Sequence, residues 1–191
     1  MASMTLTLKN VRIAWPDLFT PRKVNAADEN EEAKYGVQIL LDKGTDEGRA
    51  NIEAIKGALK KLAAESFPSD PKAIKSDKQP LRDGDSEDAN DIYKGFVFFR
   101  ASAKRRPVVV NRDRSPLAES DGFPKGGDYV NVALGLYSVD NQFGKRLCAS
   151  LDAVQFVRSG DSIGGRSAVS AESVFDNLES SSSDDGGDIN F

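Results

Sequence analysis

The amino-acid sequence predicts a mainly β fold: a small antiparallel barrel of five or six strands with one main helix. Several segments alternate apolar and polar side chains, which is the pattern of half-buried strands. Only residues 46–66 place a long series of apolar side chains at helical spacing. Long strands joined by irregular loops, without regular strand–helix alternation, favour a closed barrel over a parallel sheet.

Two strands are expected before the helix. Residues 5–13 alternate on either side of Lys9-Asn10, which predicts a strand with a bulge at that dipeptide. Residues 14–33 contain two prolines and predict a loop, and residues 34–41 predict the second strand.

The helix has a clear start and end. Thr45 is a suitable N-cap, and Asp46 and Glu47 fall in the first turn, where negative charge favours the helix dipole. Phe67-Pro68 ends the helix, because the residue before a proline disfavours helical backbone. The apolar side chains of its buried face are Ile52, Ile55, Leu59 and Leu62.

The remaining strands follow a polar, irregular segment, residues 68–92. A basic turn, residues 104–107, separates the first two of them. A hairpin loop, residues 140–144, joins the last two. The expected strands are residues 94–103, 108–110, 129–139 and 145–157.

Charge divides the chain into two parts. Six acidic residues and no basic residue follow Arg166, so the net charge of −4 separates into −6 beyond Arg166 and +2 before it. Such asymmetry is typical of proteins that bind nucleic acid and also of proteins with a solubilising tail. We therefore expect a folded domain, residues 1–166, and a flexible acidic tail, residues 167–191.

Composition excludes several kinds of chemistry. The chain contains no histidine, which removes the Ser-His-Asp triad and every imidazole base. Cys148 is the only cysteine, which excludes disulfides within the chain and cysteine-built zinc sites. No apolar run is long enough to span a membrane, and the first ten residues do not resemble a signal peptide. We expect a cytoplasmic protein that is not an enzyme and uses no cofactor or metal.

One predicted strand combines aromatic and cationic side chains on a single face. Phe96 and Phe98 share this face with Arg100 and Lys104, while the opposite face is apolar. Single-stranded nucleic acid binds to such surfaces, because bases stack on aromatic rings and phosphates pair with cations. Two structural explanations need no ligand: the phenylalanine rings could be buried under a loop, and the basic residues could form a solvated loop. The candidate phosphate contacts here are Arg100, Lys104, Arg105, Arg106, Arg112 and Arg114.

A second strand carries two tyrosines on one face. Tyr129 and Tyr137 are separated there by small residues, which predicts a shallow trough open to a base. A tyrosine that is packed and hydrogen-bonded is the structural alternative. The aromatic and cationic theme recurs more weakly at Trp15, Phe143, Lys145 and Arg146.

Five carboxylates between Asp83 and Asp91 invite a metal interpretation. A calcium loop would need a glycine where Asp88 stands. A magnesium-dependent nuclease would need carboxylates that converge from separate strands, which one polar loop does not supply. We interpret the cluster as a solvated loop, and a metal-dependent nuclease is the alternative from another functional class.

The chain ends with acidic residues followed by two apolar ones. A partner with a basic pocket beside an apolar pocket would recognise this short linear motif. The same acids could also compete with nucleic acid for the basic residues of the domain. The candidate partner-binding residues are Asp184, Asp185, Asp188, Ile189 and Phe191.

Five segments resemble a known family, the bacteriophage-encoded single-stranded DNA-binding proteins with an OB-fold. The ending DDGGDINF is also similar to the acidic, phenylalanine-terminated tails of other single-strand binders. The matching segments are NVRIAWPDLFTPR (10–22), KYGVQILLDK (34–43), YKGFVFFRASAKRRPVVVNR (93–112), DYVNVALGLYSVDNQFGKR (128–146) and LDAVQFVRSGDSIGGRSA (151–168).

The resemblance implies a Greek-key OB barrel that coats single-stranded DNA without sequence preference during phage replication, recombination or repair. It also implies a tail that recruits replication proteins in the host cytoplasm. One feature departs from the family pattern: OB-folds usually place the helix after the third strand, whereas here it follows the second. A single-strand annealing recombination protein is the alternative within the class, and a homodimer is left open.

Overall fold

The computed structural model describes residues 2–23, 30–69, 74 and 78–163. It contains one sheet whose strands follow the order β3-β4-β2-β1-β6-β7-β5. All neighbouring strands are antiparallel except β5, which runs parallel to β7. The strands are β1 (Ser3–Arg22), β2 (Lys34–Asp42), β3 (Arg82–Asp83), β4 (Phe96–Ala103), β5 (Val108–Val110), β6 (Tyr129–Asn141) and β7 (Gly144–Arg158).

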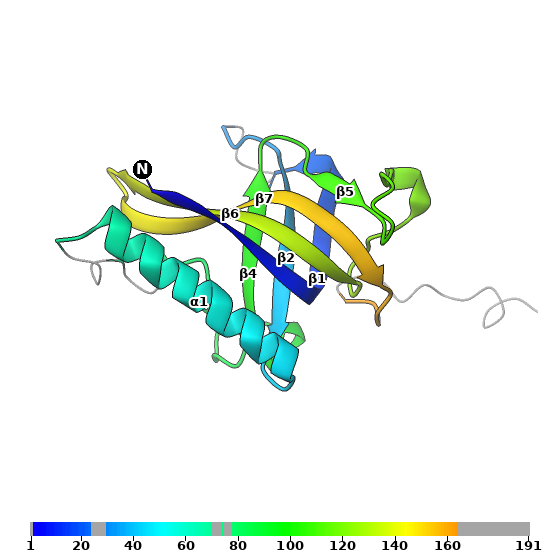
Figure 1. Ribbon diagram of the computed structural model, residues 1–191, viewed down its shortest axis with the longest axis horizontal. Coiled ribbons are helices and arrows are strands. Elements are labelled where there is room, and N and C mark those ends of the chain that lie inside the picture. Colours follow the sequence, from blue (N-terminus) through cyan, green and yellow to red (C-terminus); the bar gives the residue numbers. More distant parts are fainter. Residues whose placement is uncertain (1, 24–29, 70–73, 75–77, 164–191) are drawn as a thin grey trace, which may run out of the picture.

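The five long strands curl into a partly open barrel (Figure 1). β4 and β7 lie at opposite ends of the run β4-β2-β1-β6-β7, yet they approach each other in space. No hydrogen-bonded ladder joins them within the described structure, so the barrel has an open seam there rather than the full closure we predicted. A partly open five-stranded barrel is the architecture of the OB-fold, and the predicted fold class is confirmed. The sheet has seven strands rather than the predicted five or six, because the short strand β3 lies in the segment 68–92 that we expected to be irregular.

Strand β1 is longer than the sequence suggested, because residues 14–22 belong to it and are not a loop. Three shifts of register interrupt its pairing, and the last lies between Asp17 and Arg22. The first lies between Leu8 and Val11, which confirms the bulge predicted at Lys9-Asn10. The second lies between Ala14 and Asp17, at Trp15-Pro16. A proline is tolerated at a bulge because the ladder needs no N–H donor there.

The helix α1 (Asp46–Ser66) has the predicted bounds. The hydroxyl of Thr45 caps it by accepting a hydrogen bond from the Gly48 backbone N–H at 3.1 Å. Its apolar face packs against β1, β2 and β6, and Figure 1 shows it lying along one side of the barrel. The helix follows β2 in the chain, as the sequence predicted.

The last two strands form a long hairpin with a tighter turn than expected. Asn141 pairs with Gly144, so only Gln142 and Phe143 connect the strands, rather than the five-residue loop we predicted. Gly144 has φ +96°, a left-handed conformation that glycine adopts without strain. The short turn lets both strands extend beyond the predicted limits and project past the barrel (Figure 1).

The barrel interior is filled by side chains from alternate positions of the strands, which the helix face completes. Val97, Phe99 and Ala101 are the inward residues of β4, as the alternation predicted. A smaller apolar cluster lies on the outer face, around Ala14 and Leu40. Arg100 and Ser102, the outward residues of β4 that belong to neither cluster, are partly exposed.

The proposed division into a domain and a tail lies partly outside the described residues. Residues 164–191 are not described, so the boundary after residue 166 and the tail motif stay predictions. Within the described part of the chain, no helix has the length and apolar character needed to cross a membrane.

Two glycines of α1 give opposite expectations for the same substitution. A Cβ at Gly48 would lie 1.9 Å from the Asp42 carbonyl oxygen, whereas a Cβ at Gly57 meets no atom within 4 Å. Gly57→Ala should therefore raise the free energy of unfolding by about 1 kcal/mol through helix propensity. Gly48→Ala should lower it by about 1–3 kcal/mol through overpacking. Urea denaturation followed by circular dichroism measures both, and shifts of the same sign would contradict the close approach at Gly48.

Candidate nucleic-acid interface

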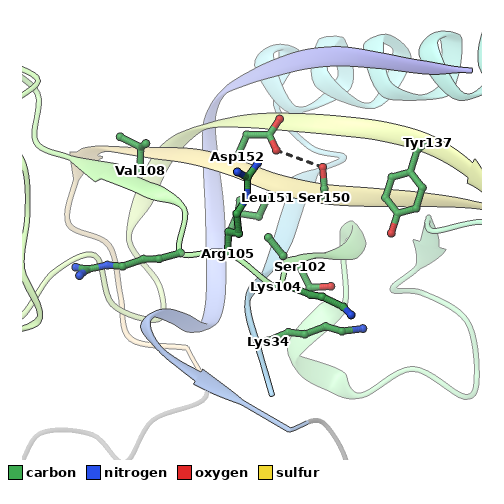
Figure 2. Close-up of a pocket in the computed structure, with 11 residues that line it drawn as sticks. Lys34, Ser102, Lys104, Arg105, Val108, Tyr137, Ser150, Leu151 and Asp152 are labelled. Atoms are coloured by element: carbon green, nitrogen blue, oxygen red, sulfur yellow. Dashed lines mark hydrogen bonds between the residues drawn. The ribbon is translucent and has the colours of Figure 1, made fainter. Parts of the chain in front are cut away.

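A groove follows the open seam between β4 and β7 on the outer surface of the barrel. It consists of two adjoining hollows of about 760 Å³ and 530 Å³. Lys34, Ser102 and Tyr137 line both hollows, so we treat them as one feature and call it the seam groove. Figure 2 shows part of the first hollow, with side chains converging from β2, β4, β7 and the turn after β4.

The seam groove is strongly basic. Asp152 is the only acidic side chain among its lining residues, and it accepts a hydrogen bond from Ser150 Oγ at 3.3 Å. A concave surface lined by one sign of charge concentrates the field and attracts a polyanion. The basic lining residues are Lys34, Arg82, Arg100, Lys104, Arg105, Arg106 and Arg146.

Two of these arginines have buried donors without acceptors. The Nε atoms of Arg100 and Arg146 are buried and have no hydrogen-bond partner in the described structure. Arg100 is held in place from its other side, because its Nη2 lies 3.3 Å from an Asp17 carboxylate oxygen and packs over Gly36. An unsatisfied buried donor is costly, and a phosphate oxygen would satisfy it. Both arginines line the same hollow of the seam groove.

Tyr137 is the exposed aromatic residue of the seam groove, with 38% of its surface accessible. Burial of its hydroxyl end raises the pKa of Tyr137, as does the neighbouring Cys148, while the charge of Arg146 acts in the opposite direction. The tyrosine therefore stays neutral near pH 7. Its ring is available to a base, next to a cation that is available to a phosphate.

Phe98 also lines the seam groove, but another ring already covers one of its faces. Tyr93, on the short 3-10 turn η2 (Asp91–Tyr93), stacks on it with ring centres 3.9 Å apart and planes 7° apart. Trp15 meets Tyr93 edge-on at 5.9 Å. The three rings lie on the outer face of the barrel beside Arg100, whose charge opposes the burial that raises the pKa of Tyr93.

Phe96 and Tyr129 lie away from the seam groove. Both line a smaller pocket at the start of α1. Tyr129 lies eight positions before Tyr137 in β6, which is about 26 Å of extended chain. Its ring is covered by the guanidinium group of Arg158 at 3.4 Å. The two tyrosines share a strand face, as predicted, but the structure does not bring them together.

The trough expected between the tyrosines is partly filled. A Cβ at Gly135 would lie 2.4 Å from Ser150 Oγ, which shows that the serine occupies the space above the glycine. Asn131 is also engaged, since its amide nitrogen donates to Gln155 at 3.0 Å. The open surface therefore lies at the Tyr137 end of β6 only.

Two further candidates, Phe143 and Lys145, lie near the tip of the β6–β7 hairpin and outside the seam groove. Phe143 projects there with 67% of its surface accessible and lines neither hollow. Lys145 turns toward the end of the helix, with Nζ 5.0 Å from the centre of the Phe67 ring. Of the hairpin residues that the sequence predicted, only Arg146 lies in the seam groove.

The basic cluster that follows β4 divides into two parts. Lys104 forms an ion pair with Glu32, Arg106 packs over the Phe19 ring at 5.2 Å, and both remain in the groove lining with Arg105. Arg112 instead packs over Phe156 at 5.8 Å. Arg112 and Arg114, in the loop after β5, line neither hollow.

The acidic segment is tied to the barrel by a lysine. Lys43 forms ion pairs with both Asp83 and Asp85, at 2.6 Å to the latter, and holds the pKa of each carboxyl group below its usual value. Asp85 also accepts a hydrogen bond from the Gly95 backbone N–H at 2.7 Å. These contacts fix the segment that carries Tyr93 to the barrel. Among the described residues, no group of three or more side chains could hold a metal ion.

Some of the groove residues were not singled out from the sequence. Lys34 and Gln38 come from β2 and face the groove because that strand pairs with β4 across Arg100 and Ser102. Predicting that Lys34 and Gln38 face the groove would require knowing the register in which β2 pairs with β4. Tyr93 lies on a short turn without periodicity, so no sequence pattern marks it. The predicted tail residues 184–191 lie outside the described structure.

Comparison with known proteins shows the family of the chain. The family model of the Enterobacter phage Enc34 single-stranded DNA-binding protein matches residues 4–186. Protein p50 of Acyrthosiphon pisum secondary endosymbiont phage 1 is 38% identical over 182 residues, covering 92% of this chain and 94% of p50.

Solved structures share the fold. The Enc34 protein matches with a TM-score of 0.71 and 23% identity, covering 90% of each chain. The same protein in complex with single-stranded DNA matches with a TM-score of 0.70, covering 84% of this chain and 89% of that one. The gp2.5 protein of bacteriophage T7 matches more distantly, with a TM-score of 0.53 and 15% identity over the whole of both chains. From the family match over nearly its full length, the chain belongs to the phage single-stranded DNA-binding protein family represented by Enc34.

Proposed function

We propose that this protein binds single-stranded DNA without sequence preference and coats it during phage DNA replication, recombination or repair. The observation that carries the proposal is the seam groove of this member of a single-strand-binding family. It combines seven basic side chains, two of which have a buried Nε donor without a partner in the described structure, with an exposed aromatic ring. Base stacking tolerates every sequence, because each base has an aromatic face.

The geometry favours a single strand over a duplex. Tyr137 would stack on a base face, and base faces are exposed only where the strand is unpaired. Arg100 and Arg146 would contact the phosphates on either side of the open seam. We propose no catalytic step, because the acidic segment that suggested a nuclease is engaged with Lys43.

The acidic tail extends the proposal to protein partners. Its carboxylates and terminal Phe191 suit a partner with adjoining basic and apolar pockets, such as a replication or recombination protein. This part of the proposal is supported by the sequence alone. We also propose that the protein acts in the cytoplasm of the infected host.

The primary test compares a labelled oligo-dT with a duplex of equal length by fluorescence anisotropy, without magnesium, at low and moderate salt. We expect tighter binding to the single strand and weaker binding as salt rises. Equal affinity for both would contradict stacking and leave a general polyanion site. Failure to bind either would overturn the proposal.

Charge removal inside and outside the groove should have unequal effects. Arg105→Gln with Arg106→Gln removes two groove cations, while Arg112→Gln with Arg114→Gln removes two that lie outside it. The first pair should reduce the slope of log affinity against log salt by about 0.7 for each lost phosphate contact. The second pair is the matched control for net charge and should change the slope less. Equal slopes for both variants would show that only total charge matters.

Ring removal should weaken binding without changing its salt dependence. Tyr137→Ala should lower the affinity for oligo-dT by the stacking energy of one base, about 1–3 kcal/mol. Phe143→Ala removes an exposed ring at the hairpin tip and should leave affinity nearly unchanged, because that ring lies outside the groove. Titrations at several salt concentrations measure both quantities. A larger loss from Phe143→Ala would move the binding surface to the hairpin.

A further inference from the structure

The seam groove does not include the most unusual aromatic residue of the chain. Trp15 has φ +44°, a left-handed conformation that is rare for a bulky side chain. It stands at the second bulge of β1, where an extra residue faces β2. Strain of this kind persists only where the surrounding structure imposes it, and it is frequent at binding sites. Here the bulge leaves the indole at the surface, with 39% of its area accessible.

Trp15 continues a row of aromatic rings that begins in the groove. Phe98 lines the seam groove, Tyr93 stacks on Phe98, and Trp15 meets the edge of Tyr93. We call these three residues the aromatic row. They come from β4, η2 and β1, so the row crosses the outer face of the barrel from the seam toward β1. A single strand that leaves the groove at Phe98 meets this row next.

The row is held rigidly before any ligand binds. The Tyr93 backbone N–H donates to the Asn90 carbonyl at 2.9 Å, and a Cβ at Gly84 would lie 1.9 Å from the Tyr93 carbonyl oxygen. The Lys43 ion pairs fix the same segment from its other end. Rings that are already ordered lose little conformational entropy on binding, which favours their use as a stacking surface.

We infer that Trp15 is a second base-stacking site, which receives an unpaired nucleobase from the strand bound in the seam groove. The inference rests on the proposed function and extends it, because it gives the strand a path across β4, β2 and β1. Tyr93 supports the indole edge-on and closes one face of Phe98. The bound base then adds to the exposed side of Trp15.

The chain offers a direct readout, since Trp15 is its only tryptophan. Oligo-dT of about 16 nucleotides, the upper site size of an OB domain, is titrated into the full-length protein while anisotropy and tryptophan emission are recorded together. A base stacked on the indole should quench its emission in proportion to the anisotropy change. Saturated anisotropy with unchanged emission would overturn the inference while leaving the proposed function intact. Absence of any anisotropy change would overturn both.

Two variants separate stacking from folding. Trp15→Gly removes the ring and suits the positive φ, so it should weaken oligo-dT binding about fivefold or more without lowering the thermal unfolding midpoint. Tyr93→Ala should reduce the quenching at saturation, because the indole loses its edge-on support. Phe143→Ala is the control ring and should preserve the quenching. Full affinity in Trp15→Gly would contradict the inference even if quenching were seen.

Discussion

The open seam between β4 and β7 is the constraint on which the rest of the structure depends. A closed ladder at this place would satisfy the edges of both strands and leave a smooth barrel. Here the two strands approach without pairing, and the outward side chains of each line the gap. β3 and β5 pair with only short stretches of β4 and β7, so the seam remains accessible between them. The basic groove is a consequence of incomplete closure.

The seam also explains how charge is arranged around it. Arg100 and Arg146 project from the two facing strands, and a barrel without the gap would have no room for a ligand between them. Lys34 and Lys104 add positive charge at one end of the same surface (Figure 2). The acidic segment is kept apart from these cations because Lys43 engages two of its carboxylates.

Sequence patterns predicted most of the regular elements and the bulge at Lys9-Asn10, but they missed the second half of β1 and the turn that carries Tyr93. Alternation in β4 identified its inner and outer faces, and helical spacing with Thr45 gave the bounds of α1. The same period placed Tyr129 and Tyr137 on one face, but period alone says nothing of distance along a strand or of Arg158 covering a ring. Pro16 suggested a loop, yet a bulge accommodates it within β1. Tyr93 and Lys34 depend on tertiary contacts and strand register, which no local pattern encodes.

Several energetically unfavourable features lie on the surface formed by the seam groove and the aromatic row. Of the four buried side-chain polar atoms without a partner in the described structure, two belong to Arg100 and Arg146. Trp15 is strained and exposed, and Tyr137 keeps a large aromatic surface in contact with solvent. Each feature costs stability in the free protein, and the densely packed barrel interior offsets that cost. Phosphate oxygens would satisfy the arginines and bases would cover the rings, so one polyanionic, unpaired strand would relieve these separate costs together. Because one bound strand would satisfy the arginines and cover the rings, the seam groove and the aromatic row fit a single binding surface.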